Sequence, residues 1–151
     1  MTTVVRAFVD TNVLLRAIQT TLPLHFEADA LIASARQQGY ELWVSRQVIR
    51  EYVVQVTRPG FLASPYKAKQ VTAKVKVIRA TFQVADDMDA VTDRLLELIE
   101  EYPTGGKKIH DANIVATMLA FNIHTLLTQN VEDMKRFSSK IALMPLEKRK
   151  I

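Results

Sequence analysis

The chain has 151 residues, of which 48% are apolar and 24% charged, and its formal net charge is +4. These values are typical of one soluble, globular domain with a substantial core, and they argue against a disordered protein. The sequence contains no cysteine, which excludes disulfide bonds, thiolate zinc sites and cysteine nucleophiles.

The charge and the apolar segments also bear on partners and compartment. No apolar run is long enough to span a bilayer, and the N-terminal residues lack the apolar core of a signal peptide, so we expect no membrane association and a cytoplasmic location. A basic balance favours a polyanionic partner, although a well-solvated surface explains it equally well. Basic residues are concentrated at 67–79 and 107–108, where they either guide a nucleic-acid backbone or simply face solvent.

Short β-branched runs alternate with longer segments of helical periodicity. In chain order, we predict a strand at 4–9, helices at 13–18 and 25–38, a strand at 40–44, helices at 46–57 and 67–80, a strand at 81–84, helices from 86 or 87 to 101 and at 109–121, a strand at 124–127, a short helix at 131–137 and a strand at 141–144. This alternation, without linker or internal repeat, predicts an α/β sandwich in which one parallel sheet is covered by helices.

The first strand ends in a carboxylate, Asp10, which is followed by Thr11 and Asn12. Open α/β sheets bind ligands just beyond the carboxyl ends of their strands, so Asp10 is placed where a functional residue is expected. Aspartate is also a common helix N-cap, and a capping role fits this stretch equally well.

Asp111 lies at an unexpected position in the predicted helix 109–121. Its neighbours at i+3, i+4 and i+7 are Ile114, Val115 and Met118, which places Asp111 near the middle of the apolar stripe. A buried charge is costly unless it is compensated. The free N–H groups of the first helical turn compensate an anion by up to about 1 kcal/mol, and a bound cation is the stronger remedy.

Two further acids allow a structural and a functional interpretation. Asp133 follows the strand 124–127 and stands three residues after Asn130, the spacing of an approximate capping box, yet its loop also leaves the sheet at the edge predicted for Asp10. Thr128, in the same loop, is placed either to bond one of these carboxylates or to hold a phosphate oxygen. Glu51, on helix 46–57, lies roughly 130° from the centre of the apolar face, which also fits an ordinary surface position.

Carboxylates that converge on one point raise one another's pKa and stay ionised only when cations hold them. Ligands that offer only oxygen select hard divalent cations, Mg²⁺ or Mn²⁺, over zinc. Such a cation activates water and neutralises charge on a phosphoryl oxygen, so the predicted chemistry is phosphodiester hydrolysis.

Together these motifs resemble the PIN domain, and the compact length is similar to that of VapC-type toxins of bacterial toxin–antitoxin pairs. The residues that carry the resemblance are Asp10-Thr11-Asn12, Glu51, Ile109-His110-Asp111-Ala112 and Thr128-x-Asn130-x-x-Asp133. The resemblance covers nearly the whole chain. It implies that residues 1–151 form a single PIN-like domain, a three-layer α/β sandwich with a short, mainly parallel central sheet covered by helices.

The resemblance also implies a function. PIN domains of this kind are Mg²⁺- or Mn²⁺-dependent ribonucleases, usually endonucleases, often dimeric and held inactive by a small antitoxin protein. By resemblance, Asp10, Glu51, Asp111 and Asp133 are the catalytic, metal-binding carboxylates. The supporting residues would be Thr11, Asn12, Thr128 and Asn130, where Asn130 stands in place of the Asp that some relatives carry. Water as the nucleophile would leave a 5′-phosphate and a 3′-hydroxyl on the RNA.

The sequence is also compatible with two alternative functions. One is a catalytically silent PIN-like module that binds RNA or a protein. The other is a haloacid dehalogenase-like phosphatase, since Asp10 would suit an aspartyl nucleophile, but that chemistry needs a second Asp where this chain has Asn12.

Overall fold

A five-stranded sheet, in which every pair of neighbouring strands is parallel, forms the centre of the computed structural model, which describes residues 3–148. Its strands are β1 (Val5–Val9), β2 (Tyr40–Ser45), β3 (Gln83–Ala85), β4 (Thr125–Thr128) and β5 (Ala142–Pro145). Their order across the sheet is β3-β2-β1-β4-β5. The register of the central pair places Val9 opposite Leu127, so β1 and β4 end side by side.

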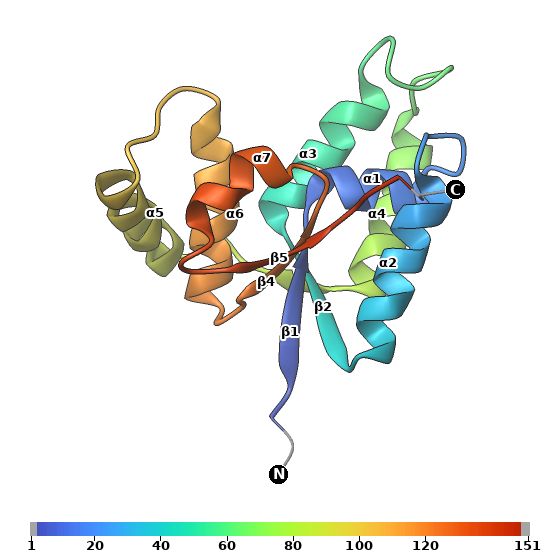
Figure 1. Ribbon diagram of the computed structural model, residues 1–151. Coiled ribbons are helices and arrows are strands. Elements are labelled where there is room, and N and C mark those ends of the chain that lie inside the picture. The colour runs from blue at the N-terminus through green and yellow to red at the C-terminus, as the bar shows by residue number, and fades with distance from the viewer. Residues whose placement is uncertain (1–2, 149–151) are drawn as a thin grey trace.

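Helices cover both faces of this sheet. They are α1 (Thr11–Ile18), α2 (His25–Gln37), α3 (Arg46–Thr57), α4 (Ala68–Thr81), α5 (Asp89–Glu101), α6 (Lys108–Ala120) and the short α7 (Val131–Met134), which a 3₁₀ turn (Lys135–Phe137) extends. Figure 1 shows α2 and α4 on one side of the sheet and α5 and α6 on the other. The expected three-layer α/β sandwich is therefore confirmed. None of the helices within residues 3–148 is long and apolar enough to cross a membrane.

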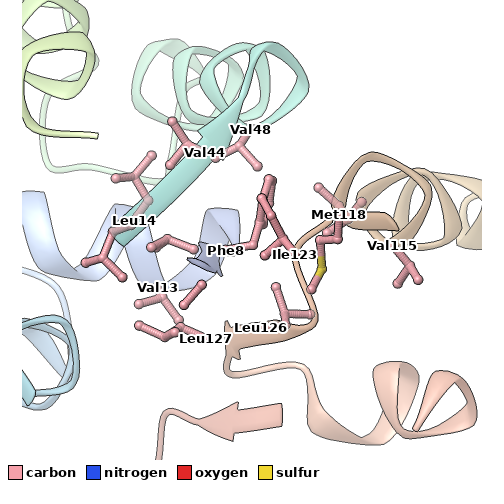
Figure 2. Packing of buried hydrophobic residues seen from close by; sticks show 14 of the residues in the cluster. Phe8, Val13, Leu14, Val44, Val48, Val115, Met118, Ile123, Leu126 and Leu127 are labelled. Carbon is pink, nitrogen blue, oxygen red and sulfur yellow. The ribbon is translucent and has the colours of Figure 1, made fainter. Parts of the chain in front are cut away.

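The core lies on both sides of the two central strands. Phe8 of β1 and Leu126 and Leu127 of β4 are fully buried, and they pack against apolar side chains of the covering helices such as Val48 and Met118 (Figure 2). A parallel sheet covered on both faces needs apolar side chains on both sides of its strands, which is why Ala7-Phe8-Val9 of β1 and Leu126-Leu127 of β4 are apolar and buried.

Several element boundaries differ from the predictions. The first helix begins at Thr11 rather than residue 13, because Asp10 already caps it. The third strand begins at Gln83 rather than residue 81, because α4 continues to Thr81 and the N–H of Phe82 still bonds within that helix. Residues 81 and 82 therefore complete a helix before any strand begins.

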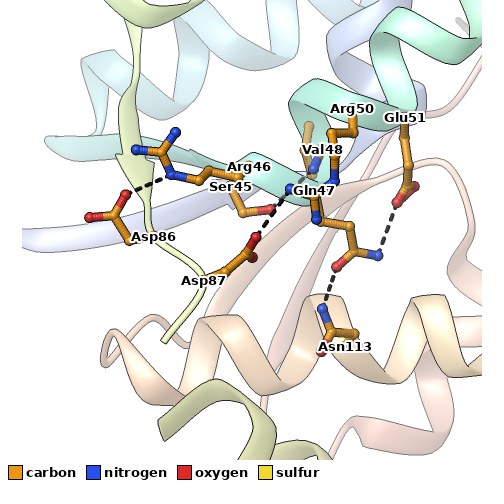
Figure 3. Close-up of polar contacts among 9 residues, drawn as sticks. All are labelled: Ser45, Arg46, Gln47, Val48, Arg50, Glu51, Asp86, Asp87 and Asn113. Carbon is orange, nitrogen blue, oxygen red and sulfur yellow. Dashed lines mark hydrogen bonds and ion pairs between the residues drawn. The ribbon is translucent and has the colours of Figure 1, made fainter. Parts of the chain in front are cut away.

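The N-cap predicted for α5 at Asp86 or Asp87 is wrong. Met88 occupies the cap position and makes no side-chain cap bond. The two carboxylates pair with arginines of α3 instead, Asp86 with Arg46 at 2.8 Å and Asp87 with Arg50 at 3.1 Å. These ion pairs join the segment after β3 to α3 (Figure 3).

The strand order creates a crevice at the carboxyl ends of β1 and β4. The chain moves from β1 through β2 to β3 toward one edge and then returns through β4 to β5 toward the other. Because crossovers are right-handed, this reversal sends the connections to opposite faces. Ligands of open α/β sheets bind at such a reversal point, which here lies beside Asp10 and Thr128.

Candidate functional site

Asp10 lies at this crevice with its carboxylate almost fully enclosed. Only 6% of the residue is exposed. Its Oδ1 accepts a hydrogen bond from the backbone N–H of Thr11 at 2.8 Å, and its Oδ2 accepts one from the Thr128 hydroxyl at 2.7 Å. Asp10 therefore caps α1 and also faces the crevice, so the two roles considered for it are compatible.

The environment of Asp10 disfavours its charge. Burial raises the pKa of the Asp10 carboxyl to about 6, although the hydrogen bonds from Thr128 and Thr11 oppose this shift. The nearby carboxylates of Glu51 and Asp111 raise the pKa of Asp10 further. An ionised Asp10 therefore lacks a compensating positive charge, which a bound cation would supply.

Glu51 extends from α3 toward Asp10 and is half-buried. Its Oε2 accepts a hydrogen bond from the Thr11 hydroxyl at 3.3 Å, and its Oε1 accepts one from Gln47 Nε2 at 3.0 Å. Burial is the main cause that raises the pKa of Glu51, and the charge of Asp111 adds to it. The structure thus gives Glu51 specific partners, and the simple surface position that its helical angle allowed is wrong.

Asp111 reaches the same crevice from the first turn of α6. It is half-buried rather than enclosed within the apolar stripe, because this turn borders the crevice and the following residues fill the core. Burial and then the charge of Asp133 raise the pKa of Asp111, and the cationic groups of Arg136 and Lys108 oppose them.

Asp133 differs from the other three acids. Its side chain is exposed, and its connection to the site is its charge near Asp111. The predicted capping box is wrong, because Asn130 holds the cap position of α7 without a side-chain cap bond. The backbone N–H of Asn130 instead donates to the Thr128 hydroxyl at 2.9 Å, which ties this loop to the end of β4.

We call the crevice the acidic cleft. It has a volume of about 530 Å³, and the three carboxylates line it together with Thr11, Asn12 and Asn130. Asn12 also holds the β4–α7 loop, because its Oδ1 accepts a hydrogen bond from the backbone N–H of Gln129 at 3.0 Å. Asp133 does not line the cleft.

The donor set of the acidic cleft fits a hard divalent cation. Asp10, Glu51 and Asp111 offer carboxylate oxygens, and each has a raised pKa because burial and its acidic neighbours disfavour its charge. Within residues 3–148, however, no three acidic or histidine side chains already stand close enough together to ligate one ion. The arrangement brings three of the four predicted acids to one cleft and leaves the fourth at its margin.

Gln47 is a site residue that the sequence analysis missed. Gln47 is only 6% exposed, and its side chain forms hydrogen bonds with Glu51, with the carbonyl oxygen of His110 and with Asn113. Figure 3 shows the bonds to the side chains of Glu51 and Asn113. The position of Gln47 four residues before Glu51, on the same face of α3, was the available signal.

Comparisons with known proteins agree with this fold. The model of the family described as PIN domain matches residues 7–139. No curated protein sequence matches the chain. Among solved structures, VapBC2 of Rickettsia felis, bound to a DNA fragment from its promoter, matches with a TM-score of 0.67 and 21% identity over 93% of this chain and 98% of the other.

Two further structures are similar to this chain. A toxin–antitoxin complex from Klebsiella pneumoniae has a TM-score of 0.65 and 19% identity, covering 95% of this chain and 99% of its own. Mycobacterium tuberculosis VapC20, described as a toxin that cleaves the sarcin–ricin loop, has a TM-score of 0.65 and 16% identity, covering 86% of this chain and 94% of its own. At these identities the likeness shows a shared fold.

Proposed function

This chain belongs to the PIN domain family, and we propose that it is a Mg²⁺- or Mn²⁺-dependent endoribonuclease that hydrolyses RNA phosphodiester bonds. The observation that supports this most is the acidic cleft, where Asp10, Glu51 and Asp111 face one space from three different helices or strand ends. Family membership leaves no support for the dehalogenase-like phosphatase alternative.

The proposed roles of the site residues follow from their contacts. Asp10, Glu51 and Asp111 would hold the cation. When bound, such a cation lowers the pKa of a water molecule and neutralises charge on a phosphoryl oxygen. Thr128 and Thr11 orient the Asp10 carboxylate through the hydrogen bonds that they donate to it. Because water is the nucleophile in this proposal, the products carry a 5′-phosphate and a 3′-hydroxyl.

Asn12, Asn130 and Asp133 would act less directly. Asn12 and Asn130 hold the loop between β4 and α7 against the site through their bonds to Gln129 and Thr128. Asp133 contributes negative charge beside Asp111.

A second cleft supports a polyanionic substrate. It has a volume of about 510 Å³ and is lined by Arg46, Arg50 and Arg79 and also by Asp86, the ion-pair partner of Arg46, and we call it the basic cleft. Arg50 borders both the basic and the acidic cleft, so the two are adjacent. Arginine contacts with phosphates supply affinity without sequence information, and an RNA strand that crosses Arg50 would bring its backbone to the three carboxylates.

We further propose that the chain is the toxin of a type II toxin–antitoxin pair in the cytoplasm, with a small cognate antitoxin and a homodimeric assembly. This proposal is supported by its likeness to VapBC2 of R. felis and to the toxin–antitoxin complex of K. pneumoniae. It predicts growth arrest when the chain is expressed alone and rescue when the neighbouring small gene is expressed with it.

The activity is tested by incubating purified protein with RNA and Mn²⁺. We expect the wild type to cleave RNA to products with 5′-phosphate ends, and Asp10→Asn and Asp111→Asn to be inactive. Asp93→Asn, which changes an exposed residue of α5, is the matched control and should cleave normally. Cleavage that persists in both site variants would contradict the proposal. RNA binding without cleavage by the wild type would support the catalytically silent module instead.

A further inference from the structure

We propose that Gln47 is a positioning residue that couples the Glu51 carboxylate to the first turn of α6, and that it thereby sets how well the acidic cleft holds a divalent cation. This inference rests on the proposed function, because it assigns to Gln47 a role in the same metal site. Gln47 itself touches neither substrate nor metal in this proposal and acts through Glu51.

The side-chain amide of Gln47 forms three hydrogen bonds. Its Nε2 donates to Glu51 Oε1 at 3.0 Å and to the backbone carbonyl oxygen of His110 at 3.0 Å. Its Oε1 accepts a hydrogen bond from Asn113 Nδ2 at 2.7 Å. Both N–H groups and the carbonyl of the amide are therefore engaged, as a side chain that is 6% exposed requires.

The chemistry of the partners determines which way the amide points. A carboxylate and a backbone carbonyl are acceptors only, so they must face the NH₂ group of Gln47. Turning the amide over would place its oxygen against both acceptors and its NH₂ group against the NH₂ group of Asn113. One orientation is therefore strongly favoured, and it directs a donor at Glu51 Oε1.

These bonds join two helices that come from separate parts of the chain. Gln47 and Glu51 are four residues apart on α3, whereas His110 and Asn113 belong to α6. His110 directly precedes Asp111, so the amide links the backbone beside one proposed ligand to the carboxylate of another. Figure 3 shows the Gln47 side chain between Glu51 and Asn113.

The second oxygen of Glu51 is held independently. Thr11 Oγ1, which comes from α1, donates to Glu51 Oε2 at 3.3 Å. The longer distance makes this the weaker of the two bonds. Without Gln47, only Thr11 would restrain a side chain with three rotatable bonds, and the carboxylate would turn away from Asp10 and Asp111, whose charges repel it.

The inference is tested by measuring Mn²⁺ binding to the purified chain by titration calorimetry. Gln47→Met keeps the length of the side chain but removes all three hydrogen bonds, and we expect it to weaken Mn²⁺ binding by about 10-fold or more, as loss of outer partners of metal ligands does. Gln37→Met is the control, because it makes the same substitution at an exposed position of α2 that does not line the acidic cleft. It should bind Mn²⁺ as the wild type does.

A double-mutant cycle separates positioning from simple loss of structure. In a Glu51→Gln background, Gln47→Met should cause little further loss of Mn²⁺ affinity, because the carboxylate through which Gln47 acts has been removed. The inference would be overturned if Gln47→Met weakened Mn²⁺ binding equally in the wild-type and Glu51→Gln backgrounds. It would also be overturned if Glu51→Gln alone weakened Mn²⁺ binding but Gln47→Met alone did not. If Gln47→Met fails to fold, Asn113→Ala replaces it, because this substitution removes only the hydrogen bond to the carbonyl oxygen of Gln47. We expect Asn113→Ala to weaken Mn²⁺ binding less than Gln47→Met, and to have little effect in the Glu51→Gln background.

The result that would contradict the proposed function differs from the result that would contradict the role of Gln47. If the wild type binds no Mn²⁺, or if Asp10→Asn and Asp111→Asn bind it as tightly as the wild type, the metal site itself is absent and the role of Gln47 falls with it. If those variants lose binding and Gln47→Met does not, only the inference about Gln47 is overturned.

Discussion

The hydroxyl of Thr128 lies 2.7 Å from Oδ2 of Asp10, although 118 positions separate the two residues in the chain. Thr128 is the last residue of β4, and Asp10 directly follows β1, its parallel neighbour. The same hydroxyl accepts a hydrogen bond from the N–H of Asn130 at 2.9 Å, so its own hydrogen is directed at Asp10. This pair joins the two strand ends that border the acidic cleft.

Thr128→Val should destabilise the protein. The substitution keeps the shape of the fully buried side chain but leaves the Asn130 N–H without its partner and leaves Asp10 Oδ2 with only the longer bond from Asn12 Nδ2, at 3.4 Å. Loss of a buried hydrogen-bond partner costs about 1–3 kcal/mol. Urea unfolding measures the change, and Thr92→Val, at an exposed position of α5, is the control. Equal stability of both variants would show that the Thr128 hydroxyl does not support Asp10.

Asp10→Asn should stabilise the protein when metal is removed. Burial raises the pKa of Asp10 from 3.8 to about 6, so the ionised carboxylate at pH 7 opposes folding by about 3 kcal/mol. Asparagine has no charge and can still accept the hydrogen bond from the Thr11 N–H. We therefore expect a higher melting temperature than that of the wild type in EDTA. A lower melting temperature would mean that the cap depends on a negative charge.

The pH dependence of stability should identify the same group. Because the folded-state pKa of Asp10 is raised to about 6, the folded protein binds more protons than the unfolded chain between pH 4 and pH 6. The free energy of unfolding of the wild type in EDTA should therefore fall as the pH rises through this window. In Asp10→Asn this free energy should fall less, because the variant lacks the titrating carboxyl of Asp10. Glu51 and Asp111 also have raised pKa values and contribute in the same direction. Unfolding free energies from pH 4 to pH 7 test this, and parallel curves for the two proteins would contradict it.

Mn²⁺ should remove the advantage in melting temperature that Asp10→Asn has over the wild type in EDTA. A cation that binds only the folded chain stabilises it in proportion to the logarithm of its concentration above the dissociation constant. The wild type should therefore melt at a higher temperature in Mn²⁺ than in EDTA, whereas Asp10→Asn should gain little. Thermal melts at increasing Mn²⁺ measure both, and NaCl at equal ionic strength distinguishes specific binding from screening. An equal gain in the two proteins would contradict a role for Asp10 in metal binding.

The parts of the structure that follow from local patterns could be predicted from the sequence. The apolar run before Asp10 and the helical crossovers were enough to predict a parallel sheet with Asp10 at the carboxyl end of its first strand, and Ala7-Phe8-Val9 is indeed buried. The contact between Glu51 and Gln47 has a signal in their spacing of four residues on α3, whereas the contact between Glu51 and Thr11 could not be predicted, because it depends on how α1 packs against α3.

Capping patterns were the weaker guide where a competing partner was available. Asp86 and Asp87 had the spacing of N-caps, but arginines of α3 bind them instead. Asn130 had the spacing of a capping box with Asp133, but its backbone N–H bonds to Thr128 and its side chain caps nothing. The pattern at Asp86 and Asp87 was outweighed by residues distant in the chain, which the spacing of neighbours does not reveal, whereas the partner of the Asn130 N–H is only two residues away.

The four acids should not contribute equally to activity. Asp111 is half-buried and lines the acidic cleft, whereas Asp133 is exposed and affects the site through its charge near Asp111. An exposed charge acts through screened interactions of at most about 1 kcal/mol, so Asp133→Asn should lower the cleavage rate by no more than about fivefold. Asp111→Asn removes a proposed metal ligand and should lower it by more than about 100-fold.

Cleavage rates at low and high salt test this difference. Because screening weakens an exposed charge, the effect of Asp133→Asn should shrink further at high salt, while the effect of Asp111→Asn should persist. If Asp133→Asn were as inactive as Asp111→Asn at both salt concentrations, the segment that carries Asp133 would have to move toward the cleft when RNA or metal binds, and all four acids would then ligate the metal together.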